Sequence, residues 1–222
     1  MGPDHNEIEK RAAAEAGAAL VEDGMTVGLG TGTTVRYLLA ALARATPRIR
    51  CVASSPETEH RARELGLEVI PFDRLEAIDL AIDGADQVHP TWWVVKGDGR
   101  AHTREKIVAA AATRFVVIVS AGKLVERLAP PVPLEVVAFG AAATLRQAGP
   151  ASLRDGPPSP DGGLIADYHG PVDDPRGLAA RLDAVPGVLG HGLFAPELVD
   201  DVLVGRGREA ELLRPSNRGP RS

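Results

Sequence analysis

Short apolar runs alternate with amphipathic segments along the first 130 residues. The apolar runs are the size of buried strands and lie at residues 25–29, 49–53, 67–70, 77–82 and 115–119. Segments with helical spacing and start or stop signals separate them, at residues 7–21, 35–43, 55–65 and from 103 onward. Thr103 is expected to cap the last of these helices. The alternation predicts an α/β fold, with a Rossmann-like, mostly parallel sheet flanked by helices.

The pattern changes at the proline-rich residues 130–133. Beyond it, strands and helices are expected in the order β-α-β-β-α-β, at residues 134–137, 141–147, 151–154, 164–167, 175–184 and 187–189. This order is typical of a small α+β domain of the ferredoxin-like kind. Residues 201–205 are expected to return to the first sheet. We therefore predict a Rossmann-like domain of residues 1–130 and 204–222, with a disordered tail at 214–222, and a small α+β domain of residues 131–203.

Composition narrows the class of protein. The 222 residues are 44% apolar and 4% aromatic, so Ala, Val and Leu must fill the core. A net charge of −5 gives no overall basic surface for nucleic acid. No segment is long and apolar enough to cross a membrane, and the N-terminus lacks the apolar segment of a signal peptide, so a cytoplasmic protein is expected. Cys51 is the single cysteine, which leaves no internal disulfide and no multi-cysteine metal site.

The turn at residues 30–34, Gly-Thr-Gly-Thr-Thr, joins a predicted strand to a predicted helix. Free N–H groups at a helix N-terminus favour an anion, and the hydroxyls of Thr31, Thr33 and Thr34 add donors. The segment is neither a dinucleotide fingerprint, because Thr33 replaces the last glycine, nor a Walker loop, because no Gly-Lys-Ser/Thr follows. A phosphomonoester or sugar phosphate suits it, and a plain turn capped by threonines is the alternative.

Charged residues gather where the strand at 77–82 ends. Asp83 and Asp86 follow that strand, and Lys96 and Glu105 come shortly afterwards. Open α/β sheets bind their ligands at the carboxyl ends of the strands. Three carboxylates and a lysine at this edge indicate proton transfer on a small polar molecule. Any one of them taken singly could instead be a turn cap or a solvated loop residue.

These motifs, in this order, resemble the ribose-5-phosphate isomerases of the A type. The resemblance rests on residues 28–34, 83–86, 96–99, 103–106, 133–136, 169–170, 186–188 and 192–195. It spans residues 7–205, which is nearly the whole chain. The Asp-Gly-Ala-Asp and Thr-Arg-Glu-Lys stretches in register are its most specific part.

The resemblance implies a dimeric enzyme that interconverts ribose 5-phosphate and ribulose 5-phosphate with no metal or other cofactor. Glu105 would move a proton between C1 and C2 through a cis-enediolate. Asp83 and Lys96 would assist at the sugar oxygens, and Asp86 would line the site. The substrate-binding residues implied are Thr31, Gly32, Thr33, Thr34, Gly97, Gly99, Lys123 and Lys10. The last two would lie near the phosphate.

Four residues depart from the family pattern, namely Gln87, Asp98, Arg100 and His102. Asp98 puts a negative charge into a turn that usually consists of glycines, and Arg100 is expected to offset it. A specialised paralogue acting on a related sugar phosphate is therefore an alternative, and so is a non-catalytic sugar-phosphate sensor. A metal-dependent isomerase is a third reading, although the six histidines are scattered without metal-ligand spacing.

Overall fold

The computed structural model describes residues 4–75 and 77–215, so most of the predicted tail lies outside the described residues. The chain forms two compact units. The first holds the described residues up to Ala85, Arg104–Lys123 and those from Glu197 on, and the second holds Asp86–Thr103 and Leu124–Pro196. Residues 86–103, which the sequence analysis assigned to the first domain, are thus in the second unit, and residues 197–203 are in the first. No described helix could cross a membrane.

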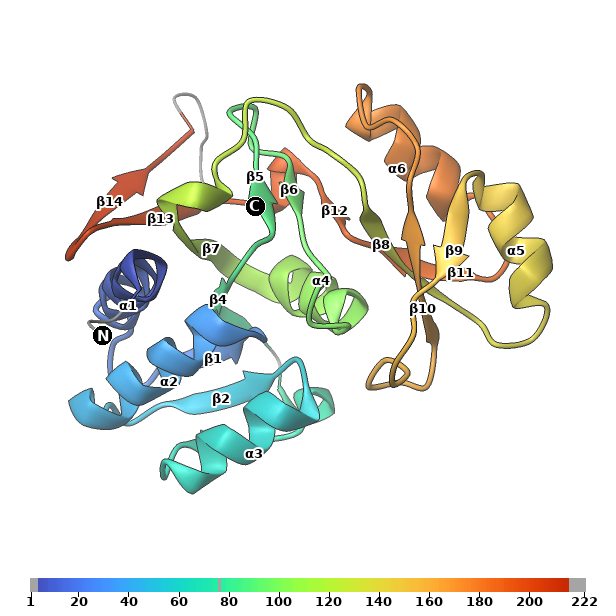
Figure 1. Ribbon diagram of the computed structural model, residues 1–222. Coiled ribbons are helices and arrows are strands. Elements are labelled where there is room, and N and C mark those ends of the chain that lie inside the picture. The colour runs from blue at the N-terminus through green and yellow to red at the C-terminus, as the bar shows by residue number, and fades with distance from the viewer. Residues whose placement is uncertain (1–3, 76, 216–222) are drawn as a thin grey trace. The chain divides into compact units, whose positions relative to one another are not determined.

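The first unit is built on a seven-stranded sheet in the order β14-β13-β7-β4-β1-β2-β3 (Figure 1). Its strands are β1 (Thr26–Leu29), β2 (Arg50–Ala53), β3 (Glu68–Val69), β4 (Ile78–Asp83), β7 (Ala112–Ser120), β13 (Asp201–Arg206) and β14 (Glu209–Leu213). All neighbours are parallel except the hairpin of β13 and β14. The predicted return of the chain to this sheet after the small domain is confirmed by β13. Strand β14 escaped prediction because it contains two glutamates and lacks an apolar run.

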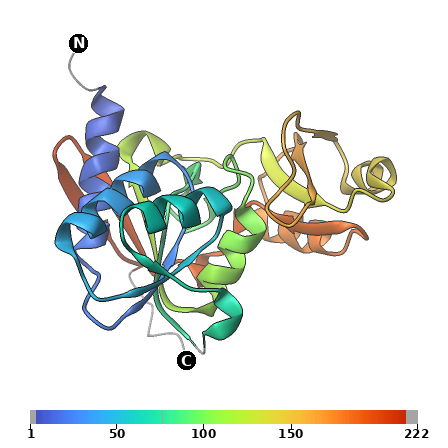
Figure 2. The ribbon, with the colours of Figure 1, turned by 90° about the horizontal axis from the view of Figure 1, so that it is seen from below.

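Four α-helices belong wholly or mostly to this unit, α1 (His5–Ala18), α2 (Thr33–Ala45), α3 (Pro56–Glu64) and α4 (His102–Ala111), and η1 (Phe72–Arg74) follows β3. Helix α1 packs against α2, which in turn packs against α3 (Figure 2). Small residues let α1 approach the sheet closely, because a β-carbon on Gly17 would lie 3.1 Å from Ile118 and 3.5 Å from Ile82. The core is made mainly of Ala, Val, Leu and Ile, as the low aromatic content predicts.

The second unit contains a four-stranded antiparallel sheet in the order β11-β8-β10-β9. Its elements are β8 (Val132–Val136), α5 (Ala141–Ala148), β9 (Ala151–Leu153), β10 (Leu164–Tyr168), α6 (Pro175–Asp183) and β11 (Val188–His191). Both the β-α-β-β-α-β order and the 4-1-3-2 strand order match a ferredoxin-like arrangement, which confirms the predicted α+β topology. A second, three-stranded sheet of β5 (Gln87–Val88), β6 (Val94–Val95) and β12 (Leu193–Phe194) was not predicted, because two-residue strands show no periodicity.

Candidate active site

Asp83 ends β4, and its carboxylate lies against the turn that follows β1. Oδ1 of Asp83 accepts hydrogen bonds from the backbone N–H groups of Thr31 at 3.1 Å and Gly84 at 2.7 Å. A β-carbon on Gly30 would overlap the Asp83 carboxyl group, so only glycine lets the carboxylate come this close. Asp83 is 3% exposed. The acid and the threonine turn therefore form one hydrogen-bonded structure.

The threonine turn leads directly into α2. Gly32 precedes the helix with a φ of +110°, a backbone conformation that favours glycine. Gly32 and Thr33 are exposed and Thr34 is half-buried, and none of the described side chains caps this helix end. The first N–H groups of α2 are therefore donors that an anion can use.

Two hydroxyl residues brace this turn from β2 and α3. The Thr31 hydroxyl pairs with Ser54 Oγ at 2.9 Å, and the Thr58 hydroxyl donates to the Gly30 carbonyl at 2.8 Å. Ser55 Oγ accepts the Thr58 N–H at 3.2 Å, so Ser55 is the N-cap of α3. Neither Ser54 nor Thr58 was among the predicted site residues. The available signal was a run of hydroxyl residues at the end of the strand next to β1.

Helix α4 places Glu105 at the same edge of the sheet as Asp83. The helix leads into β7, a parallel neighbour of β4, so α4 runs against the strand direction and begins at the carboxyl ends of the strands. A β-carbon on Gly28 of β1 would come within 2.5 Å of Val108, so this face of α4 lies on β1. Glu105 precedes Val108 by three residues, almost one helical turn nearer the start of α4. It therefore lies past Gly28, toward the carboxyl end of β1. It is 4% exposed.

The predicted cap of α4 is wrong. The helix begins at His102 rather than after Thr103, and Thr103 Oγ1 is buried with no hydrogen-bond partner among the described residues. Thr103 packs against β11, because a β-carbon on Gly190 would lie 2.7 Å from Oγ1. His102 is fully buried, and its Nδ1 lies close to Gly97. The contact of Thr103 with Gly190 joins residues far apart in the sequence, so local capping rules could not reveal it.

Lys96 follows β6 in the second unit and is 3% exposed. Its backbone N–H donates to the Gly192 carbonyl at 2.8 Å. Its Nζ lies 5.6 Å from the ring centroid of Phe194 on β12, which is cation–π distance. The lysine side chain is therefore packed in place and not solvated.

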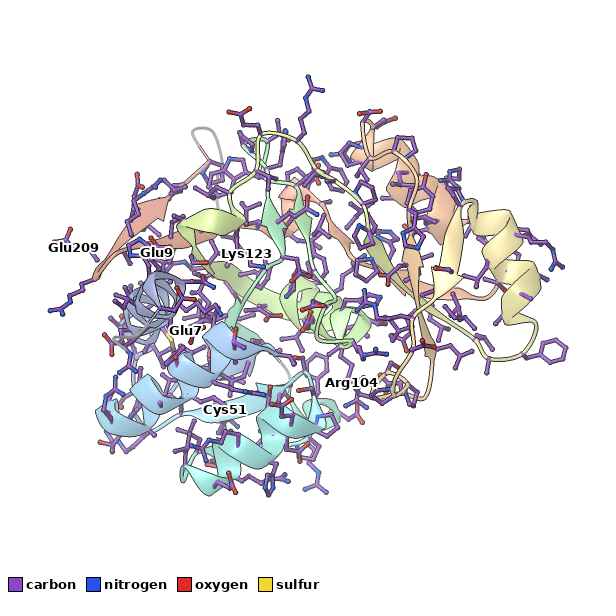
Figure 3. The ribbon with its side chains drawn as sticks, viewed as in Figure 1. Glu7, Glu9, Cys51, Arg104, Lys123 and Glu209 are labelled. Atoms are coloured by element: carbon purple, nitrogen blue, oxygen red, sulfur yellow. The ribbon has the colours of Figure 1, made fainter. Side chains whose placement is uncertain are left out.

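Lys123 ends η2 (Ala121–Lys123), the turn that follows β7, and is half-buried. The turn is fixed by Glu9 of α1, whose buried carboxylate accepts the N–H groups of Ala121 at 3.1 Å and Gly207 at 3.3 Å (Figure 3). Because η2 directly follows β7, Lys123 lies at the carboxyl edge of the sheet.

Lys10 lies on α1 in an ion pair. Its Nζ is 2.7 Å from one oxygen of Glu7, and the Tyr37 hydroxyl donates to the other oxygen at 2.5 Å. The hydrogen bonds from Lys10 and Tyr37 lower the pKa of Glu7. Any phosphate role of Lys10 must therefore compete with Glu7.

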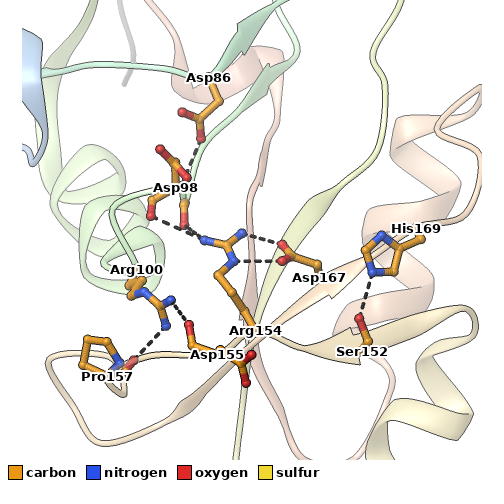
Figure 4. A network of polar contacts seen from close by, with 10 residues as sticks. Asp86, Asp98, Arg100, Ser152, Arg154, Asp155, Pro157, Asp167 and His169 are labelled. Atoms are coloured by element: carbon orange, nitrogen blue, oxygen red, sulfur yellow. Dashed lines mark hydrogen bonds and ion pairs between the residues drawn. The ribbon is translucent and has the colours of Figure 1, made fainter.

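The remaining predicted residues lie in the second unit. Asp86 is half-buried, and its Oδ2 accepts the Asp98 N–H at 3.1 Å (Figure 4). Gly97 has a φ of +119°, and a β-carbon there would lie 2.7 Å from Pro133. Gly99 is exposed.

Within residues 4–75 and 77–215, no group of three His, Cys, Asp or Glu side chains could hold a metal ion.

Comparison with known proteins fixes the family. The family model of ribose 5-phosphate isomerase A (phosphoriboisomerase A) matches residues 50–209. The ribose-5-phosphate isomerase A of Roseiflexus sp. is 43% identical over 95% of this chain and 98% of its own. The chain belongs to the ribose 5-phosphate isomerase A family. The Caulobacter vibrioides enzyme of the same name is 44% identical over 93% of this chain and 98% of its own.

Solved structures of ribose 5-phosphate isomerases have the same fold. The Neisseria gonorrhoeae ribose 5-phosphate isomerase A matches with a TM-score of 0.88 at 31% identity, over 94% of this chain and 96% of that chain. A D-ribose-5-phosphate isomerase in complex with phospho-erythronic acid matches with a TM-score of 0.87 at 34% identity, over 93% and 97% of the two chains. The predicted α/β fold class is thereby confirmed.

Two departures from the family pattern have clear contacts. Gln87 Nε2 donates to the Ala129 carbonyl at 2.7 Å, and its Oε1 accepts the Ala129 N–H at 2.8 Å, a pairing that glutamate cannot make because it has no donor. The Arg100 guanidinium donates to the carbonyls of Pro157, at 2.9 Å, and Asp155. Arg100 is therefore engaged with a different loop, and the expectation that its charge offsets Asp98 stays a prediction.

Proposed function

We propose that this protein interconverts D-ribose 5-phosphate and D-ribulose 5-phosphate. The observation that carries the proposal is the placement of Glu105 and Asp83 at one edge of the sheet, beside an anion-binding turn. Family relatives named for this activity support it. So does the relative that binds phospho-erythronic acid, because a carboxylate is planar and spreads its charge over two oxygens, as an enediolate does.

In the proposed reaction, Glu105 takes the proton from C2 of the open-chain aldose. The electron pair left behind forms the C1–C2 double bond of the enediolate, and charge builds up on oxygen. A proton passes from O2 to O1, and Glu105 returns its proton to C1 to give the ketose. One carboxylate can serve both carbons because they are adjacent. The ammonium group of Lys96 stabilises the oxygen charge, and Asp83 assists ring opening and proton transfer at the sugar oxygens.

The same proposal assigns the binding residues. The phosphate takes N–H groups at the start of α2 and the hydroxyls of Thr31, Thr33 and Thr34, with charge from Lys123 and Lys10. Gly32 lets the turn bend toward the phosphate. In the second unit, Gly97 and Gly99 let the backbone approach the sugar, and Asp86 lines the site.

An assay with ribose 5-phosphate, with and without EDTA, tests this function. Ribulose 5-phosphate should form, the reverse reaction should reach the same equilibrium, and the chelator should leave the rate unchanged. Binding without turnover would favour a sugar-phosphate sensor. Faster turnover of another sugar phosphate would favour a specialised paralogue, and loss of activity that a divalent ion restores would favour a metal-dependent isomerase.

A homo-oligomeric state stays a prediction from the family resemblance, and a cytoplasmic location stays a prediction from the sequence pattern. Light scattering on the purified protein would give the oligomeric state directly.

A further inference from the structure

The loop that follows Lys96 contains Gly97 and Gly99. Glycine allows many backbone conformations, so such a loop is flexible unless other residues bind it. In this structure it is held by Arg154, the residue that follows β9. Nη1 of Arg154 donates to the carbonyl oxygens of Gly97 at 3.1 Å and Asp98 at 3.4 Å (Figure 4). On its other side the same loop is held by Asp86, which accepts the Asp98 N–H. The Gly97–Asp98 peptide, whose carbonyl binds Arg154 and whose N–H binds Asp86, is therefore fixed from two directions.

Arg154 is itself fixed by Asp167 of β10. Its Nε lies 2.8 Å from Asp167 Oδ2, and its Nη2 pairs with Oδ1 of the same carboxylate. Such a two-point pair aligns the planar guanidinium more strictly than a single contact can. Both side chains are largely shielded, with 19% and 15% of their surface exposed. The guanidinium therefore has one orientation, and its remaining edge faces the loop.

The charges around Arg154 agree with this arrangement. The hydrogen bond to Asp167 raises the pKa of Arg154, burial opposes this, and the negative charges of Asp98 and Asp86 add to the increase. Arg154 thus supplies a positive charge near Asp98. This explains how a carboxylate is tolerated in a turn that usually consists of glycines.

We propose that Arg154 is a positioning residue for Lys96, and that the pair of Arg154 and Asp167 acts as a clamp on residues 97–98. The inference rests on the proposed function, because it concerns the aim of the Lys96 ammonium group. The clamp does not touch the substrate. It limits the conformations of the Gly97–Asp98 peptide. The Lys96 backbone then keeps the position set by its hydrogen bond to Gly192, and the side chain keeps the direction set by its packing on Phe194.

The test compares Arg154→Met, Arg154→Lys and the double variant Arg154→Met/Asp167→Asn with the wild type. The double variant is needed because Arg154→Met alone leaves the shielded Asp167 charge unpaired and can destabilise the fold. Arg146→Met, an exposed arginine on α5, controls for the loss of one positive charge. The measurements are kcat, KM, the melting temperature, and hydrogen exchange of residues 97–101 compared with Val132–Val136 of β8.

If Arg154 is a clamp, Arg154→Met exchanges faster at residues 97–101 but not in β8. Its kcat should fall about tenfold to a hundredfold, the cost of a misplaced group, while KM stays within about threefold. Arg154→Lys should recover part of kcat, and the double variant should recover the melting temperature but not kcat. Arg146→Met should match the wild type.

Unchanged exchange at residues 97–101 would overturn the proposal. So would a double variant that recovers kcat together with its melting temperature, because the loss would then be one of stability. Exchange is measured without substrate, so it reports on the clamp even if the wild type fails to convert ribose 5-phosphate. That failure would instead remove the proposed function.

Discussion

The Asp83 carboxylate accepts a hydrogen bond of 3.1 Å from the Thr31 backbone N–H, so the end of β4 fixes the turn at the end of β1. This contact is possible because Gly30 has no side chain between them. Asp83, which is proposed to act on the sugar, is thus hydrogen-bonded to the turn at residues 30–34, which is proposed to bind the phosphate. Displacing either should therefore disturb both.

Gly30→Ala tests this coupling. Its β-carbon would overlap the Asp83 carboxyl group, so Asp83 and the turn must move apart. We expect kcat/KM to fall at least about tenfold, with a loss of stability of about 1–3 kcal/mol from overpacking. Gly122→Ala is the matched control, because a β-carbon there meets nothing within 4 Å. Wild-type kinetics in Gly30→Ala would contradict the proposed role of this contact.

Lys123→Ala tests the phosphate site. Removal of one charged donor from a bound phosphate costs about 1.5–3 kcal/mol, so KM for ribose 5-phosphate should rise about tenfold or more. The value of kcat should change little, since Lys123 is not proposed to act on C1 or C2. Steady-state kinetics at several salt concentrations, with Arg146→Ala as the control, measure the effect. An unchanged KM would mean that Lys123 does not bind the phosphate and is a solvated loop residue.

Cys51 gives a pH prediction that is independent of the active site. Burial, with a smaller contribution from the charge of Glu68, raises the pKa of this thiol from 9.0 to about 12 (Figure 3). Between pH 9 and 12 the unfolded chain loses the thiol proton while the folded protein keeps it, so stability falls as the pH rises. The contribution approaches about 1.4 kcal/mol per pH unit.

Urea unfolding of the wild type and Cys51→Ala between pH 9 and 10.5 would detect this contribution. The variant should lose stability less steeply with pH, whatever constant cost its smaller side chain brings. Equal slopes for the two proteins would show that the thiol titrates alike in the folded and unfolded states.

Local patterns predicted the parts of the fold that depend on local physics. Ser55 and Pro56 begin α3 as the capping rules require, and Gly66, with a φ of +82°, follows its end. The meeting of residues from different strands at the carboxyl edge was also predictable, because parallel strands bring the residues that follow them to one side of the sheet. Asp83 and the threonine turn meet there for that reason.

Features set by distant pairing could not be read from the sequence. Strands β5, β6 and β12 are each two residues long and form only because they pair with one another. Arg154 reaches Gly97 across 57 positions, and no motif marks an arginine at the end of a short strand as the partner of a distant glycine loop. Thr103 was misjudged for the same reason, since Gly190 of a distant strand decides what its hydroxyl contacts.

Glu105→Gln is the most direct test of the central claim, that Glu105 is the base of a proton-transfer isomerase. The amide keeps the shape of the side chain and removes the base, so ribose 5-phosphate should still bind while kcat falls by about two to four orders of magnitude. Glu64→Gln, a surface change on α3, is the control and should leave kcat unchanged. In D2O the wild type should place solvent deuterium on the product at the transferred position. A Glu105→Gln variant with near-normal kcat would contradict the account.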